Sequence, residues 1–175
     1  MKAFTEISKK SKLYENVAEL ADILSTGSVF VVDPSIGSAS SSPAWSLYKD
    51  STLVESGTIN TGGSHSPLWK RARSLGRAIT ELTERIGPDV LVYEDIPATS
   101  GYNQNAVASL LKAVGIILAC SKSSHVLGVH PASWKNYVRQ TYTKGDEEDA
   151  IEIGYIVTGL ARSMQDSKAH QRDGR

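Results

Sequence analysis

The chain has 175 residues, of which 40% are hydrophobic and 22% are charged, and its formal net charge is zero. This composition is typical of one soluble globular domain, and no apolar run approaches the roughly 18 residues that a membrane span needs. Without a net positive charge, any contact with nucleic acid has to come from local basic patches. The single cysteine, Cys120, cannot form an internal disulfide, so we expect a reducing, cytoplasmic environment.

The first 60 residues predict an accessory helix followed by three strands. Residues 1–27 form a polar arm and a helix, because apolar residues recur at helical spacing from Leu13 to Leu24. Compact apolar runs then predict strands over 28–35, 44–50 and 52–60. Asp50 and Ser51 form the turn between the last two strands, which therefore pair as an antiparallel hairpin.

The remainder of the chain alternates helices with strands. The clearest helix starts near Ser66, a candidate N-cap, and ends at Gly87. Further strands are predicted over 89–97 and 125–131, and further helices over 103–120, 132–140 and 146–162. In the helix 103–120, the residues expected to pack inward are Leu110, Leu111, Val114, Ile117 and Leu118.

This order of elements predicts the class of fold. Strands that alternate with helices have to pair in parallel, whereas the hairpin is antiparallel. We therefore predict an α/β fold over residues 28–163, with a mixed five-stranded sheet flanked by helices. The polar segment 164–175 is predicted to be a flexible tail.

Two of the predicted strands end in a carboxylate. The run VFVVD ends at Asp33, and the run VLVYE ends at Glu94. If these strands are parallel neighbours, both side chains lie at the edge of the sheet where open α/β folds bind ligands. Either residue alone is better explained as a solvated charge after a strand, but the matching pair favours a functional site.

The acidic segment DEEDAIEIG opens the last predicted helix. At about 100° per residue, Asp146 and Asp149 lie toward the face that packs on the protein, whereas Glu148 and Glu152 point to solvent. Asp146 could equally cap the helix or interact with its dipole. Asp149 lies beside an apolar face and needs a partner, because burying an unpaired charge is costly. A divalent metal would supply that partner.

Carboxylates that converge on one spot repel one another and raise each other's pKa values. Acid-rich oxygen sites select hard cations such as Mg²⁺ or Mn²⁺. Two such ions about 4 Å apart activate a water and stabilise the leaving oxygen of a phosphodiester. Together, Asp33, Glu94, Asp146 and Asp149 therefore predict a metal-dependent nuclease.

Taken in order, these motifs resemble the RuvC family of Holliday-junction resolvases, within the RNase H-like superfamily. The matching segments lie within residues 29–160 and are VVDPS, VYEDIP, NAVASLLKAVGIILAC, VHPASWK and DEEDAIEIG. The resemblance implies an RNase H-like fold to which the N-terminal helix is an addition. Ser35 and the short segment between Pro131 and Asp146 depart from the cellular family and are more similar to divergent, phage-type members.

The resemblance also implies an activity and a set of site residues. Asp33, Glu94, Asp146 and Asp149 would be the catalytic acids, and they would bind Mg²⁺ or Mn²⁺, with two ions in each active site. The enzyme would be a homodimer that nicks two opposed strands of a four-way junction, since two active sites match a junction with two-fold symmetry. It would act in a bacterial or phage-infected cytoplasm.

Five residues are candidates for DNA contacts. Tyr102 and Asn103 lie in a loop where RuvC-like enzymes present an aromatic wedge that stacks on junction bases, although Tyr102 could equally be an ordinary loop residue. Lys135 matches a basic position of VHPASWK and is either a phosphate contact or plain surface. Arg71 and Arg73 lie on the outer face of a helix that could contact phosphates, be solvated or support a dimer.

Two other functions remain open from the sequence. The first is a less selective nuclease of the same fold that cuts flaps, forks or replication intermediates. The second is a catalytically silent module that binds branched DNA or a partner protein, which the neutral net charge would suit. Cleavage rates on junction, flap and linear duplex separate these functions from a dedicated resolvase.

Overall fold

The computed structural model describes residues 12–36, 42–63, 65–96, 104–138 and 145–173. In these ranges the strands are β1 (Ser28–Asp33), β2 (Ala44–Lys49), β3 (Thr52–Thr58), β4 (Val90–Glu94) and β5 (His125–Val129). The helices are α1 (Lys12–Glu19), α2 (Ala21–Thr26), α3 (Leu68–Ile86), α4 (Gln104–Cys120), α5 (Pro131–Val138) and α6 (Asp146–Asp173). None of the helices described is long and apolar enough to span a membrane.

The five strands form one mixed sheet in the order β3-β2-β1-β4-β5. The hairpin β2–β3 and the pair β1–β2 are antiparallel, whereas β4 pairs in parallel with both β1 and β5. The tight hairpin turn places Asp50 and Ser51 at positive φ, 49° and 60°. The predicted α/β fold with a mixed five-stranded sheet is thus confirmed.

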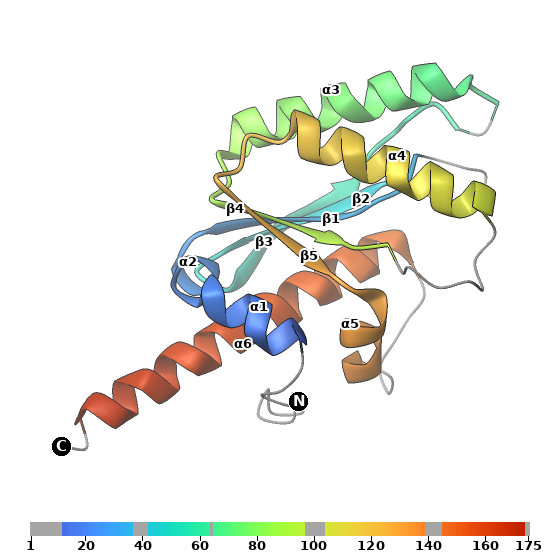
Figure 1. The fold of residues 1–175 in the computed structure, drawn as a ribbon. Helices are drawn as coiled ribbons and strands as arrows, with labels where there is room; N and C mark the ends of the chain where they lie inside the picture. The colour runs from blue at the N-terminus through green and yellow to red at the C-terminus, as the bar shows by residue number, and fades with distance from the viewer. Residues whose placement is uncertain (1–11, 37–41, 64, 97–103, 139–144, 174–175) are drawn as a thin grey trace.

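Successive residues of the central strand β1 enter two separate cores. Val29 and Val31 pack with residues of α1, α2 and α6, whereas Phe30 and Val32 pack with residues of α3 and α4. Figure 1 shows the same layers, with α3 and α4 above the sheet and α1, α2 and α6 below it. A strand that is buried on both faces has to be apolar at every position, which explains its unbroken hydrophobic run.

Helix α6 is held against β2 by side chains of the strand. The Ser46 hydroxyl donates to the carbonyl of Ala150 over 2.8 Å, and the Tyr48 hydroxyl donates to the carbonyl of Ile151 over 2.7 Å. Gly154 has no side chain to obstruct this approach, since a Cβ there would lie 2.2 Å from Cε2 of Tyr48. These contacts fix the first turns of α6 over the sheet.

The N-terminal region differs in detail from the single helix predicted. It forms two short helices that meet at Leu20, whose backbone angles (φ −113°, ψ 12°) interrupt the helix. The apolar positions were nevertheless identified correctly, because Leu13, Val17 and Leu24 are all buried in the core beside α6. The break lets both short segments bury their apolar sides.

Helix α6 continues to Asp173, so most of the segment 164–175, which was predicted to be a flexible tail, is helical. Met164 is still buried, and the Gln165 amide donates to the Asp22 carboxylate of α2. From Asp166 to His170 the residues of the helix are exposed. Its Gln, Lys, Ala and Arg residues have good helix propensity, which composition-based expectations of disorder overlook.

Two predicted helix details are also wrong. The predicted cap Ser66 does not cap α3, since its hydroxyl donates to the carbonyl of Gly62, and Pro67 is the N-cap residue instead. In α4, Val114 and Ile117 are buried as expected, but Leu111 and Leu118 are 58% and 39% exposed. Helix α4 is apolar on nearly all sides, so periodicity could not identify its inner face.

Candidate metal centre

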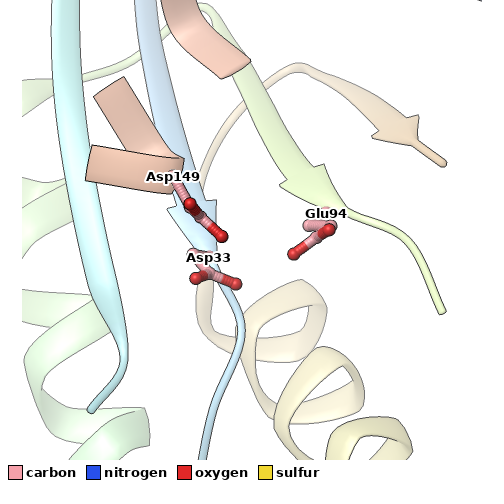
Figure 2. A group of neighbouring side chains, drawn as sticks. All are labelled: Asp33, Glu94 and Asp149. Carbon is pink, nitrogen blue, oxygen red and sulfur yellow. The ribbon is translucent and has the colours of Figure 1, made fainter. Parts of the chain in front are cut away.

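Asp33 and Glu94 end two neighbouring parallel strands. In the register of β1 and β4, Val32 lies opposite Tyr93, so the next residue of each strand emerges at the same edge of the sheet. Figure 2 shows the two carboxylates at the tips of these strands. The predicted convergence of Asp33 and Glu94 at the carboxyl edge is therefore found.

Asp149 reaches the same point from the first turns of α6. Its backbone N–H donates to the carbonyl of Gly145 over 2.9 Å, and the residue is only 8% exposed. Each of Asp33, Glu94 and Asp149 offers a carboxylate oxygen, and these oxygens all lie within 4.8 Å of one another. We call these three residues the acidic triad. Three convergent oxygen donors can hold a hard divalent cation.

Lys135 of α5 forms ion pairs with two members of the triad. Its Nζ lies 3.0 Å from Oε1 of Glu94 and 3.8 Å from Oδ2 of Asp149. Burial disfavours the ammonium, but the charges of Glu94, Asp149 and Asp33 outweigh this effect and raise the pKa of Lys135. The lysine is thus charged and lies beside the triad. The sequence alone had left two interpretations of Lys135 open, a phosphate contact and an ordinary surface residue.

Trp134 contacts the triad through Glu94. It is fully buried, and its indole Nε1 donates to Oε1 of Glu94 over 3.3 Å. Its ring also lies 4.9 Å from the Lys135 ammonium. The sequence VHPASWK carries no signal that the indole of Trp134 reaches a carboxylate.

A pocket of about 140 Å³ opens beside the triad. Its charged lining residues are Asp33, Glu94, Asp95 and Lys135, and Pro34 and Leu110 are among the residues that line the rest. Carboxylates and an ammonium therefore face the same small space. That combination suits a ligand with both a bound cation and negatively charged oxygens, such as a phosphodiester.

Three of the predicted site residues are not placed by the structure. Asp146 is the first residue of α6, but its side chain is outside the described part of the chain, as are Tyr102 and Asn103 altogether. Whether Asp146 joins the triad therefore stays a prediction. So does the aromatic wedge at Tyr102.

The two arginines predicted to contact DNA lie in a different layer from Asp149. Arg71 and Arg73 belong to α3, on the opposite face of the sheet from α6 (Figure 1). Arg71 is partly buried and its Nε donates to the carbonyl of Ser66 over 3.1 Å, whereas Arg73 is exposed. Their predicted contact with DNA is therefore separate from the triad.

The outer acids of α6 divide differently from the prediction. Glu148 is exposed as expected, but Glu152 is only partly exposed, and its burial raises the pKa of its carboxyl. Glu152 also lies close enough to Tyr48 to help raise the pKa of that phenol, after the larger effect of burial. The helical wheel predicted that Glu152 is exposed to solvent, because a wheel does not represent the strand that lies beside the helix.

No protein-family model matches the sequence, and no curated protein matches it. The structure, however, resembles solved structures. Thermus thermophilus RuvC in complex with a Holliday junction substrate aligns with a TM-score of 0.62 and 14% identity, over 78% of this chain and 95% of that chain. Another Thermus thermophilus RuvC structure gives a TM-score of 0.54 and 14% identity, over 78% and 96% of the two chains.

The yeast mitochondrial Holliday junction resolvase Ydc2 aligns over 94% of this chain and 100% of its own, with a TM-score of 0.56 and 10% identity. At 10% to 14% identity these alignments establish the architecture. The chain has the RNase H-like fold of the RuvC-type resolvases.

Proposed function

We propose that the protein is a metal-dependent, structure-selective endonuclease that resolves four-way DNA junctions by paired nicking. The acidic triad carries the proposal, because three carboxylates from separate elements converge at the sheet edge where α/β folds bind ligands. The fold supports it, since one similar structure is in complex with a Holliday junction substrate and another is a Holliday junction resolvase.

The residues present fit a divalent metal. The triad supplies only oxygen donors, which suits Mg²⁺ or Mn²⁺ rather than a soft metal. When bound, such ions would supply Lewis-acid chemistry, namely a more acidic water and a stabilised leaving oxygen of the phosphodiester. Asp33, Glu94 and Asp149 would hold them, with Asp146 as a fourth ligand. Trp134 orients Glu94 for this task through its indole N–H.

DNA contacts are proposed at two distances from the centre. Lys135 has its ammonium beside the triad and would contact the phosphate next to the scissile bond. Farther out, Tyr102 and Asn103 would stack on and bond to junction bases, and Arg71 and Arg73 would contact the backbone. Phosphate contacts of this kind make binding weaker as salt is raised.

Paired nicking requires two active sites, and the described part of the chain contains one acidic triad. We therefore propose a homodimer, whose two-fold symmetry matches that of the junction. The outer face of α4 suits this role. Leu111, Gly115, Leu118 and Ala119 are exposed there, and an apolar helix face is normally covered by a partner.

Leu111→Glu is expected to dissociate the dimer by placing a charge in an apolar interface. The dimer dissociation constant should rise by about a hundredfold or more, as measured by analytical ultracentrifugation. Val54→Glu is the matched control, because Val54 on β3 is 56% exposed and Leu111 is 58% exposed. Dissociation by both variants, or by neither, would place the interface elsewhere.

Trp134→Phe is expected to weaken Mn²⁺ binding about tenfold, because groups that orient a metal ligand typically contribute 10- to 100-fold to affinity. The variant removes the indole N–H that bonds to Glu94 and keeps an aromatic ring in the core. Isothermal titration calorimetry measures the affinity. Trp69→Phe is the control, since Trp69 is 62% exposed. Equal affinities in the two variants would argue against the orienting role.

The two alternative functions are separated by substrate and metal. Rates are measured in Mg²⁺ on a four-way junction, a flap and a linear duplex, with Ca²⁺ as the non-catalytic control. A dedicated resolvase cuts the junction much faster than the other two and nicks opposed strands as a pair. Comparable rates on all three would identify a less selective nuclease, and tight junction binding without cutting would identify a silent module.

A further inference from the structure

Lys135 lies within hydrogen-bonding range of the triad rather than at its rim. Its Nζ is 3.0 Å from Oε1 of Glu94 and 3.8 Å from Oδ2 of Asp149. The two carboxylate side chains are only 12% and 11% exposed, whereas the lysine side chain is 43% exposed. The ammonium therefore approaches two nearly buried acids from the solvent side.

This contact has a clear electrostatic cause. Three carboxylates with oxygens within 4.8 Å repel one another, and the repulsion is stronger where water is partly excluded. A cation on these oxygens removes much of that repulsion. In the metal-free protein the ammonium of Lys135 supplies the positive charge.

A divalent metal needs the same oxygens. Glu94 Oε1 already accepts from both Lys135 Nζ and the Trp134 indole. A metal ion on that carboxylate would lie a few ångströms from the ammonium, and like charges at such a distance repel. A metal ion and the ammonium on the same carboxylate therefore weaken each other's binding.

We propose that Lys135 competes with the divalent metal for Glu94 and Asp149. Its ammonium leaves these two carboxylates when the metal binds. This inference rests on the proposed function and deepens it. The exposed lysine side chain has room to turn outward. Once released, its ammonium is available to a phosphate oxygen at the same pocket. Metal binding therefore changes the partner of Lys135 from a carboxylate to a DNA phosphate.

The test is a Mn²⁺ titration by isothermal titration calorimetry, without DNA, on wild type and Lys135→Met. Methionine keeps the length of the side chain and removes its charge. The apparent dissociation constant of Lys135→Met for Mn²⁺ is expected to be about tenfold lower than that of the wild type, because the variant lacks one competing charge-assisted hydrogen bond. Lys135→Arg keeps the charge and should bind Mn²⁺ like the wild type.

Lys122→Met is the second control, because Lys122 pairs with Glu84 on the surface and not with the triad. Equal or weaker Mn²⁺ binding by Lys135→Met, with wild-type binding intact, overturns the competition and leaves the metal centre standing. No Mn²⁺ binding by either protein overturns both proposals.

The stability of Lys135→Met gives a second readout. Without metal, its triad lacks the ammonium of Lys135, so its thermal midpoint is expected below that of the wild type, and saturating Mn²⁺ should remove the difference. If the variant is unfolded without metal, recovery of its circular dichroism on adding Mn²⁺ supports the inference. Failure of Mn²⁺ to restore the fold contradicts it.

Discussion

Asp149→Asn is expected to reduce junction cleavage by more than about a hundredfold. The substitution keeps the size of the side chain and replaces a charged oxygen donor by a neutral amide, which is a much weaker ligand for Mg²⁺. Loss of a residue that only orients a metal ligand typically reduces metal affinity or activity 10- to 100-fold. Loss of the ligand itself should reduce activity further. Initial rates on a synthetic four-way junction in Mg²⁺ measure the effect.

The control is Glu148→Gln, which removes an exposed carboxylate from the neighbouring position of α6. Its cleavage rate should match the wild type. The fold of Asp149→Asn should be intact, with a thermal midpoint within about 3 °C of the wild type, because the ion pair that it loses is long and partly exposed. Unchanged cleavage by Asp149→Asn would remove Asp149 from the active site.

Gly154→Ala is expected to lower the free energy of unfolding by about 2–3 kcal/mol, the cost of overpacking a buried site and disturbing a buried hydrogen bond. A Cβ at residue 154 would lie 2.2 Å from Cε2 of Tyr48 and 2.7 Å from its Cδ2. Tyr48 cannot move aside freely, because it is 2% exposed and donates to the carbonyl of Ile151. Urea denaturation measures the change.

Gly115→Ala is the matched control within another helix. A Cβ there meets nothing within 4 Å, so the better helix propensity of alanine should raise the free energy of unfolding by up to about 1 kcal/mol. Both variants are compared at one protein concentration, low enough for the chain to be monomeric. Equal stability of the two variants would mean that the close approach of α6 to β2 is not required.

The two strand-end acids of the triad were predictable for a simple reason. Apolar runs that end at Asp33 and Glu94 mark two buried strands, and parallel strands emerge at the same edge of a sheet. Asp149 followed from the helical wheel, because a carboxylate beside an apolar face has to find a partner. The sequence therefore predicted the placement of all three residues that the structure brings together.

The neighbours of the triad were less predictable, because they depend on tertiary contacts. Nothing in VHPASWK shows that the Trp134 indole and the Lys135 ammonium meet the same oxygen of Glu94. Likewise, nothing in the sequence shows that Glu152 comes close to Tyr48 of β2. Helical periodicity describes one element at a time and carries no information about the element packed against it.

Helix α4 and the end of α6 illustrate two further limits. A helix that is apolar on nearly all sides has no unique inner face, so Leu111 and Leu118 were wrongly placed inside. The polar segment after Met164 lacks apolar residues for a core, but it continues an existing helix to Asp173 and needs no core of its own. Composition predicts whether a segment can fold alone, not whether it extends a neighbour.

The most direct measurement for the central claim is a crystal structure of the protein soaked in Mn²⁺, with the ions located by anomalous scattering. We expect Mn²⁺ between Asp33, Glu94 and Asp149, with Lys135 turned away from Glu94, and no ion at this position in Asp149→Asn. An ordered triad that still holds Lys135 and contains no Mn²⁺ at saturating concentration would contradict the proposed metal centre.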